Sequence, residues 1–287
     1  MKRALLALLV LVACGDRPPS STAGWPGAAT EPTSAPAAAC SKGSAPKGTF
    51  KRTVNVFGKS RSYTLVVPPG YAAGTSHPLI YVLHGHGGTG AQARSSFDLE
   101  GASGGKAVFV YPDGIGGGWD LDSPTPKNGD VALFDATLAI VQSDYCVDLH
   151  RVFIAGFSNG AYMANQLACR RAERVRAVAT HSGGGPYENG PDAKYDDRGA
   201  LVCSGKPVGS LVIHGAADGT VAPAEGQKSV THWTAANRCG ATPAKNGACA
   251  AYSGCVNPVV ACKVPGLGHA LWPEAKARVW AFFDQQK

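Results

Sequence analysis

Residues 151–160 read RVFIAGFSNG, and this stretch carries three signals of local structure. The apolar run 152–155 has the composition of a short buried strand, and the alanine-rich residues that follow favour a helix. Between them lies a Gly-x-Ser-x-Gly pentapeptide in which Gly156 and Gly160 let the chain turn sharply around Ser158. A serine raised on such a turn is typical of serine hydrolases, so Ser158 is the predicted nucleophile.

A second Gly-x-Ser-x-Gly match is centred on Ser103 in the sequence GASGG. The residues before it, SSFDLE, are polar, so no strand is expected to precede this serine. Ser103 is therefore interpreted as a loop residue. For Ser158 the alternative is a glycine-bracketed turn without a chemical role.

The N-terminus has the charge pattern of a secretory signal. Lys2 and Arg3 precede an apolar run, 4–13, that is too short to span a bilayer. The residues around the end of this run, LVAC, resemble a bacterial lipobox, in which the cysteine is acylated and becomes the first residue. We therefore expect a signal peptide over residues 1–13 and a lipid anchor on Cys14 that attaches an exported protein to a membrane. Cleavage as an ordinary secreted protein is the alternative.

Residues 14–47 are rich in Pro, Ser, Thr, Ala and Gly, with almost no large apolar side chain beyond Trp25. Such a segment cannot bury enough surface to fold, which predicts a flexible tether. The remaining segment, 48–287, has the size of one domain. Without Lys2 and Arg3 the chain has 25 basic and 20 acidic residues and no basic cluster, so no nucleic-acid partner is expected. We expect a monomer.

The predicted secondary structure alternates between strands and helices. Two helices are indicated by an apolar face at Val131, Phe134, Leu138 and Val141 and by the C-terminal run 272–286. Eight apolar runs are predicted strands: residues 53–56, 63–67, 79–83, 108–111, 152–155, 177–180, 211–213 and 259–264. This order predicts an α/β fold with a mostly parallel sheet covered by helices on both faces. Reactive residues then gather at the carboxyl ends of the strands.

Two further residues complete a predicted catalytic triad. His269 lies in GLGHALWP between the last strand and the last helix, where two preceding glycines let its ring reach Ser158 as the general base. His181, at another strand end, is a weaker competitor for that role. Asp218, four residues beyond His214 in HGAADGTV, is the predicted acid that orients the base. The chain order of nucleophile, acid and histidine is that of α/β-hydrolases.

An oxyanion hole requires two backbone N–H groups directed at the developing negative charge. Asn159, which follows the nucleophile, is predicted to supply one. The loop LHGHGGTG after the third strand is predicted to supply the other from His86, with Gly87 as the next choice. Trp119 and Trp272 lie near these loops and are predicted to contact the substrate, with packing as the alternative for each.

The chain has nine cysteines, and lipidation of Cys14 would leave an even number. In an exported protein an even number predicts disulfides, and the absence of a Cys-x-x-Cys pair argues against a compact zinc site. We expect no metal and no cofactor. The predicted pairs are Cys249 with Cys262 across a hairpin turn, Cys239 with Cys255, Cys146 with Cys169, and Cys40 with Cys203.

Together these motifs resemble the secreted α/β-hydrolases of the polyhydroxybutyrate depolymerase and type C and D feruloyl esterase group, within carbohydrate esterase family 1. The resemblance covers most of residues 45–285 and rests on LHGHGGTG, YPDG, the region around the pentapeptide, HGAADGTV and GHALWP. It implies the same triad of Ser158, Asp218 and His269. The chain departs from the family pattern in having one extra residue between His269 and Trp272.

The sequence therefore predicts an exported serine esterase that acts through an acyl-enzyme. Feruloyl or other carbohydrate-linked esters are the expected substrates, with plant cell-wall polysaccharide fragments as partners. A depolymerase acting on polyhydroxybutyrate or other polyester oligomers is the alternative with the same chemistry. A serine peptidase and a non-catalytic envelope binding protein are alternatives from other classes, and the intact triad argues against the last.

Overall fold

The computed structural model describes residues 45–189, 193–197 and 199–286. The predicted signal peptide, the predicted lipidation site Cys14, nearly all of the predicted tether and Cys40 lie outside these residues. Within them, the helices are too short or too polar to cross a lipid bilayer.

All strands of the described residues form one sheet of ten strands in the order β1-β2-β4-β3-β5-β6-β7-β10-β9-β8. From β4 to β10 in this order, neighbouring strands are parallel. The strands β1 and β2 at one edge and β9 and β8 at the other pair antiparallel. The bounds are β1 Gly48–Val56, β2 Lys59–Val67, β3 His77–Leu83, β4 Val108–Pro112, β5 Val147–Phe157, β6 Ala177–His181, β7 Gly209–Gly215, β8 Ala244–Asn246, β9 Cys249–Ala251 and β10 Val259–Val264.

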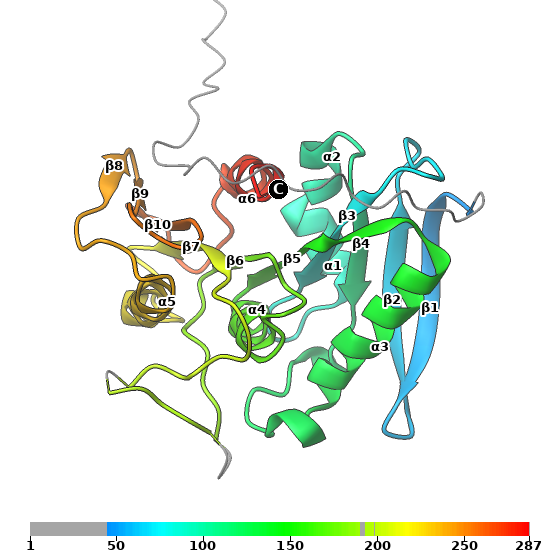
Figure 1. The fold of residues 1–287 in the computed structure, drawn as a ribbon, viewed down its shortest axis with the longest axis horizontal. Coiled ribbons are helices and arrows are strands. Elements are labelled where there is room, and N and C mark those ends of the chain that lie inside the picture. Colours follow the sequence, from blue (N-terminus) through cyan, green and yellow to red (C-terminus); the bar gives the residue numbers. More distant parts are fainter. Residues whose placement is uncertain (1–44, 190–192, 198, 287) are drawn as a thin grey trace, which may run out of the picture.

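Helices cover both faces of the sheet (Figure 1). One face packs against α3 (Gly129–Asp144), α4 (Asn159–Arg170) and α5 (Pro223–Ala236). The other packs against α1 (Gly90–Phe97), α2 (Leu99–Ser103) and α6 (Ala275–Asp284). Two short 3-10 turns, η1 (Ile115–Gly117) and η2 (Thr125–Lys127), lie in the loop between β4 and α3. The predicted α/β fold is therefore confirmed.

The burial of the strands follows from this arrangement. Every residue of β3, HPLIYVL, is buried, because a central parallel strand is covered on both faces.

Helix α3 begins after Asn128, whose side-chain oxygen accepts hydrogen bonds from the N–H groups of Asp130 and Val131. Asp130 also forms a buried ion pair with Arg61, 2.5 Å long, which ties the start of α3 to β2. Breaking such a pair would leave an uncompensated buried charge.

Each of the eight predicted strands is present, and the structure extends most of them. The sequence did not predict β8 and β9, which have three residues each, nor α1, α2 and α5. Ser103, expected in a loop, is the last residue of α2, and its hydroxyl donates to the carbonyl of Glu100.

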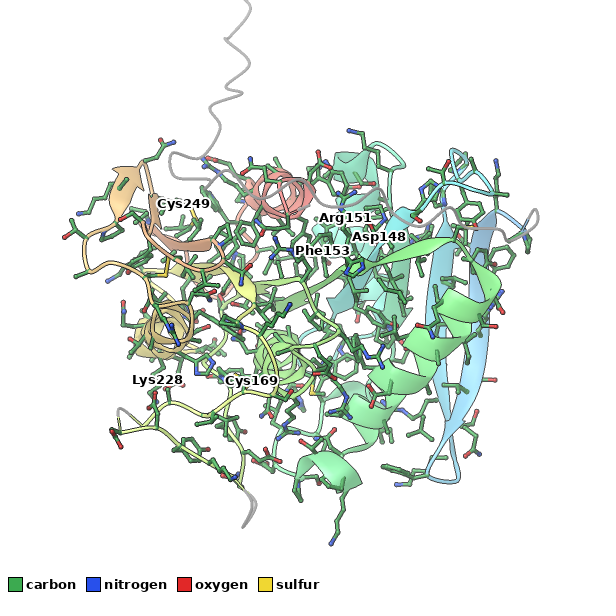
Figure 2. All side chains as sticks on the ribbon, in the orientation of Figure 1. Asp148, Arg151, Phe153, Cys169, Lys228 and Cys249 are labelled. Carbon is green, nitrogen blue, oxygen red and sulfur yellow. A yellow bond between two sulfur atoms is a disulfide. The ribbon has the colours of Figure 1, made fainter. Side chains whose placement is uncertain are left out.

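Three disulfides join cysteines within the described residues. Cys249 bonds to Cys262 and Cys239 to Cys255, in the predicted pairings, and the first pair faces across the hairpin of β9 and β10. The third disulfide joins Cys169 to Cys203. Figure 2 shows Cys169 and Cys249 on opposite sides of the sheet.

The pairings of Cys146 with Cys169 and of Cys40 with Cys203 are wrong, because Cys169 and Cys203 bond to each other. The segment after β6 returns to the C-terminal end of α4, where Ser204 donates both its N–H and its hydroxyl to the carbonyl of Cys169. Cys146, whose N–H donates to the hydroxyl of Tyr71, does not bond to Cys169.

Candidate active site

Ser158 lies between β5 and α4 in a backbone conformation that non-glycine residues rarely adopt, with φ 53° and ψ −122°. Its N–H donates to the carbonyl of His181, 2.9 Å away, which fixes the turn to β6. A Cβ at Gly156 would collide with the backbone of Gly160, and one at Gly160 with the carbonyl of His84. The two glycines are therefore needed for the close approach of the chain around Ser158.

The three predicted triad residues form a continuous chain of hydrogen bonds. Ser158 Oγ lies 3.0 Å from His269 Nε2, and His269 Nδ1 lies 2.9 Å and 3.1 Å from the two carboxylate oxygens of Asp218. Since a carboxylate only accepts, Nδ1 carries a proton and Nε2 is free to accept the proton of the serine hydroxyl. This is the geometry of a nucleophile, a base and an orienting acid.

Asp218 is buried, and its charge is held by hydrogen bonds. Burial alone would raise the pKa of this carboxyl. Hydrogen bonds from His269, the Val221 amide, the Ser182 side chain and the Thr220 amide outweigh burial and lower the pKa to about 2. Asp218 is therefore ionised at any pH at which an imidazole can act as a base.

The two N–H groups predicted for the oxyanion hole belong to His86 and Asn159. Within the described part of the chain, neither the N–H of His86 nor that of Asn159 makes a hydrogen bond. Gly87, the second choice, donates its N–H to the carbonyl of Gly117 over 2.7 Å, so it is not available. The N–H of Trp119 donates to the side-chain oxygen of Asn159, which holds the residue after the nucleophile in place.

A cavity of about 510 Å³ opens beside the triad. Its size falls within the range of small-molecule sites. Its lining combines the backbone of the His84 loop with apolar side chains and two polar side chains of α1. The residues are His84, Gly85, His86, Gly87, Gly88, Gln92, Ala93, Ser96, Phe97, Phe157, His269, Ala270 and Leu271.

The two tryptophans predicted to contact substrate do not line this cavity. Trp119 is only 7% exposed, packs in the core, and donates its indole N–H to the carbonyl of His84. Its observed place matches the packing alternative. Trp272 lines a separate cavity of about 290 Å³ and contacts the guanidinium of Arg278, while Leu271 occupies the wall beside His269.

The remaining strand-end histidines have structural partners. His84 Nε2 accepts the N–H of Gly114, and burial lowers the pKa of this ring. His214 Nε2 lies 3.0 Å from the carbonyl of Val221, to which it donates. His181, the competitor for the base, is 2% exposed and does not contact Ser158 Oγ with its ring.

The sequence analysis missed Ser182, which follows β6 with φ 57° and whose side chain helps to lower the pKa of Asp218. Its place directly after a predicted strand end was the available signal, since neighbouring strands of a parallel sheet end at the same edge.

No protein-family model matches the chain, but the chain is similar to several esterases. Feruloyl esterase C of Emericella nidulans is 34% identical over 247 residues, which make up 78% of this chain and 83% of the relative. Among solved structures, acetyl xylan esterase from Aspergillus awamori matches with a TM-score of 0.64 and 18% identity, covering 82% of this chain and 99% of that one. A CE1 ferulic acid esterase from Anaeromyces mucronatus in complex with ferulic acid matches with a TM-score of 0.54 and 16% identity over 84% and 90% of the two chains.

Proposed function

This chain belongs to the feruloyl esterase C family of carboxylic ester hydrolases with the α/β-hydrolase fold, and we propose that it hydrolyses feruloyl and other carbohydrate-linked esters through an acyl-enzyme on Ser158. The observation that carries the proposal is the hydrogen-bonded series from Ser158 through His269 to Asp218 at the edge of an open cavity. No part of this geometry requires a metal or cofactor.

In the first half-reaction, Ser158 Oγ attacks the ester carbonyl carbon while His269 Nε2 takes the hydroxyl proton. The ionised Asp218 stabilises the imidazolium that results. The N–H groups of His86 and Asn159 donate to the oxyanion of the tetrahedral intermediate. As the intermediate collapses, His269 returns the proton to the departing alcohol, and the acyl group stays on Ser158.

In the second half-reaction, a water molecule takes the place of the alcohol. His269 removes a proton from the water, the hydroxide attacks the acyl carbonyl, and the same two N–H groups bind the second oxyanion. Collapse releases the acid and returns the proton to Ser158. Each half-reaction uses the same residues in the same positions, so the site needs no rearrangement between them.

The cavity supports an aromatic acyl group. Phe97, Phe157 and Leu271 provide apolar surface for a flat ring. Gln92 and Ser96, on α1, offer polar side chains in the same wall. Ferulate combines an aromatic ring with a phenolic hydroxyl and a methoxy group, and the feruloyl esterase relatives support the same substrate class.

The test is hydrolysis of methyl ferulate and of short p-nitrophenyl esters by the purified protein, beside two serine variants. Ser158→Ala should abolish activity on every ester. Ser103→Ala, at the other Gly-x-Ser-x-Gly match, should leave it unchanged, because that hydroxyl bonds only within its own turn. Methyl ferulate hydrolysis that requires Ser158 supports the proposal.

Other results of these assays would favour one of the alternative functions. Release of soluble hydroxyacids from polyhydroxybutyrate, without activity on methyl ferulate, would favour the polyester depolymerase. Cleavage of peptides at rates that match ester cleavage would favour a peptidase. Failure on esters and peptides by a folded protein would overturn the proposal and favour a binding protein.

For localisation, we propose export and attachment to a membrane through a lipid on Cys14, with 14–47 as the tether of the domain 48–287. The N-terminal sequence supports export, as do the disulfides, which persist in oxidising compartments. Cell fractionation tests it: Cys14→Ser should move the enzyme from the membrane fraction to the soluble fraction. A wild-type protein that is already soluble would favour ordinary secretion.

A further inference from the structure

His269 and His181 approach Asp218 by separate routes, while His214 Nε2 lies 3.6 Å from Asp218 Oδ2 and donates to the carbonyl of Val221. The first is direct, from His269 Nδ1. The second passes from His181 Nδ1 to Ser182 Oγ, 3.2 Å away, and Ser182 in turn has a side chain that lowers the pKa of Asp218. The proposed catalytic mechanism uses only the first route, so the second has no assigned role.

The tautomer of His181 follows from its partners. The backbone N–H of Trp272 points at His181 Nε2 over 2.9 Å, and a peptide nitrogen can only donate. Nε2 therefore carries no proton, and the single proton of a neutral ring is on Nδ1. This proton is donated to Ser182 Oγ, which leaves the serine hydroxyl free to donate to Asp218.

His181 also connects three elements of the site. Its carbonyl accepts the N–H of Ser158 at the nucleophile turn. Its Nε2 accepts a hydrogen bond from the N–H of Trp272, three residues beyond His269, and this bond fixes the position of the loop that carries the base. The ring of Phe157 contacts both histidines, with its centroid 5.6 Å from that of His181 and 4.9 Å from that of His269.

We propose that His181 and Ser182 are positioning residues for the esterase reaction: a neutral His181, protonated on Nδ1, orients Ser182 toward Asp218 and at the same time anchors the His269 loop through the N–H of Trp272. This inference rests on the proposed function, since it assigns a task within that catalytic site. Neither residue touches the reacting atoms. Both act through the carboxylate and the loop that fix the orientation of the base.

The surroundings keep His181 neutral. The charged and titratable groups that face it are His214 on β7, His269 on the loop before α6, and Asp218 on the loop after β7. Burial, reinforced by the two histidines, lowers the pKa of His181 to about 3, although Asp218 acts in the opposite direction. The ring can thus accept from Trp272 throughout the pH range in which His269 works as a base.

Ser182→Ala tests the bridge to Asp218. We expect kcat on p-nitrophenyl acetate to fall about tenfold, the equivalent of one lost hydrogen bond, with KM changed less than about twofold. Without Ser182 beside it, the Asp218 carboxylate would stabilise the imidazolium more strongly. The midpoint of the acid side of the kcat/KM–pH profile should therefore move to higher pH by roughly half a unit.

Ser210→Ala is the matched control, because Ser210 lies in the neighbouring strand β7, is fully buried, and has no hydrogen-bond partner for its hydroxyl. It should leave both kcat and the pH profile unchanged. A purely structural effect of removing a buried hydroxyl would move neither variant's acid limb. Equal behaviour of the two variants would overturn the role of Ser182.

Two substitutions test His181 itself. In His181→Gln, the side-chain amide oxygen can accept the N–H of Trp272, whereas His181→Phe fills the volume without an acceptor. We expect His181→Gln to retain about ten times more kcat than His181→Phe at similar KM. Thermal unfolding checks that each variant folds, and equal rates in two folded variants would overturn the anchoring role.

Imidazole ¹⁵N NMR provides a readout that does not depend on activity. His181 should show a neutral ring protonated on Nδ1 from pH 7 down to pH 5, and this holds whether or not the protein hydrolyses a given ester. A ring protonated on Nε2, or one that gains a second proton in this range, would overturn the proposal. Absence of ester hydrolysis in the wild type, with the expected NMR signature, would count against the proposed function alone.

Discussion

His269 and His181 are the same side chain placed in two different settings near one carboxylate. In both, Nδ1 carries the proton, which His269 donates to Asp218 and His181 donates to the neighbouring Ser182. The difference lies at Nε2, which faces the hydroxyl of Ser158 in His269 and the peptide N–H of Trp272 in His181. A hydroxyl can give up its proton to the ring, whereas a peptide N–H cannot.

The comparison shows that the partner of Nε2 decides between a base and an anchor. Solvent access follows the same division, because His269 is partly exposed whereas His181 is buried. A general base must take up a proton during the reaction, which a partly exposed ring beside an ionised carboxylate can do. His181 is buried, and a second proton on its ring would have to bind Nε2, which would remove the hydrogen bond from the N–H of Trp272.

Replacing the base should have the largest effect. We expect His269→Gln to lower kcat by about 10⁵-fold or more, because the serine hydroxyl loses its proton acceptor. His181→Gln should remain far more active, and steady-state kinetics on p-nitrophenyl acetate checks both. A loss in His269→Gln that is no greater than that in His181→Gln would remove the distinction between the two histidines.

Replacing the shared carboxylate should have the next largest effect. In Asp218→Asn the amide can donate to His269 Nδ1, which favours the wrong tautomer, and kcat should fall by about 10⁴-fold. The tautomer of His181 should be unchanged, because Trp272 still sets it. Kinetics combined with imidazole NMR measures both, and a His181 ring that also changes tautomer would show that Asp218, rather than Trp272, controls it.

The smallest effect concerns stability against pH. The pKa of His181 is lowered from 6.5 to about 3, mainly by burial, so between these values the unfolded chain binds a proton that the folded protein does not. The free energy of unfolding should therefore fall as the pH falls from about 6.5, by up to about 1.4 kcal/mol per pH unit for this group. The contribution is fully present above the unfolded pKa and is lost with acidification.

Urea denaturation of wild type and His181→Gln between pH 7 and pH 4 measures this slope. The variant should lose less stability on acidification than the wild type. Ser210→Ala is the control, since it removes a buried hydroxyl that has no hydrogen-bond partner and no titrating group, and it should follow the wild-type slope. His232, whose pKa burial lowers to about 4, contributes in the same direction in all three proteins. Parallel curves for wild type and His181→Gln would contradict the neutral, buried ring.

Much of the fold could be predicted because buried parallel strands are apolar along most of their length, as in β3. The short strands β8 and β9 lack that signal, since β8 is fully exposed and pairs only at the edge of the sheet. Helix α5 mixes polar and apolar residues, with buried His232 and Ser229, and gives a weak helical pattern.

The arrangement of Ser158, Asp218 and His269 could be predicted because each follows a strand, and strand ends meet at one edge. The link from His181 through Ser182 could not, since it depends on which ring nitrogen faces the N–H of Trp272. The Cys169–Cys203 disulfide was missed for a similar reason, because the path of the segment after β6 back to α4 leaves no periodic signal in the sequence.

The glycines on either side of Ser158 bear on how active members of the family can be told apart from inactive ones by sequence. Because a side chain at Gly156 or Gly160 would collide with backbone, a scan of mutational tolerance should find both as intolerant as the serine, but through loss of folded protein. Ser158→Ala should instead keep the abundance of the protein and lose only turnover. Retention of the two glycines thus indicates only that a protein has kept the fold. Retention of the serine between them distinguishes an active enzyme from a descendant that has kept the fold and lost the activity.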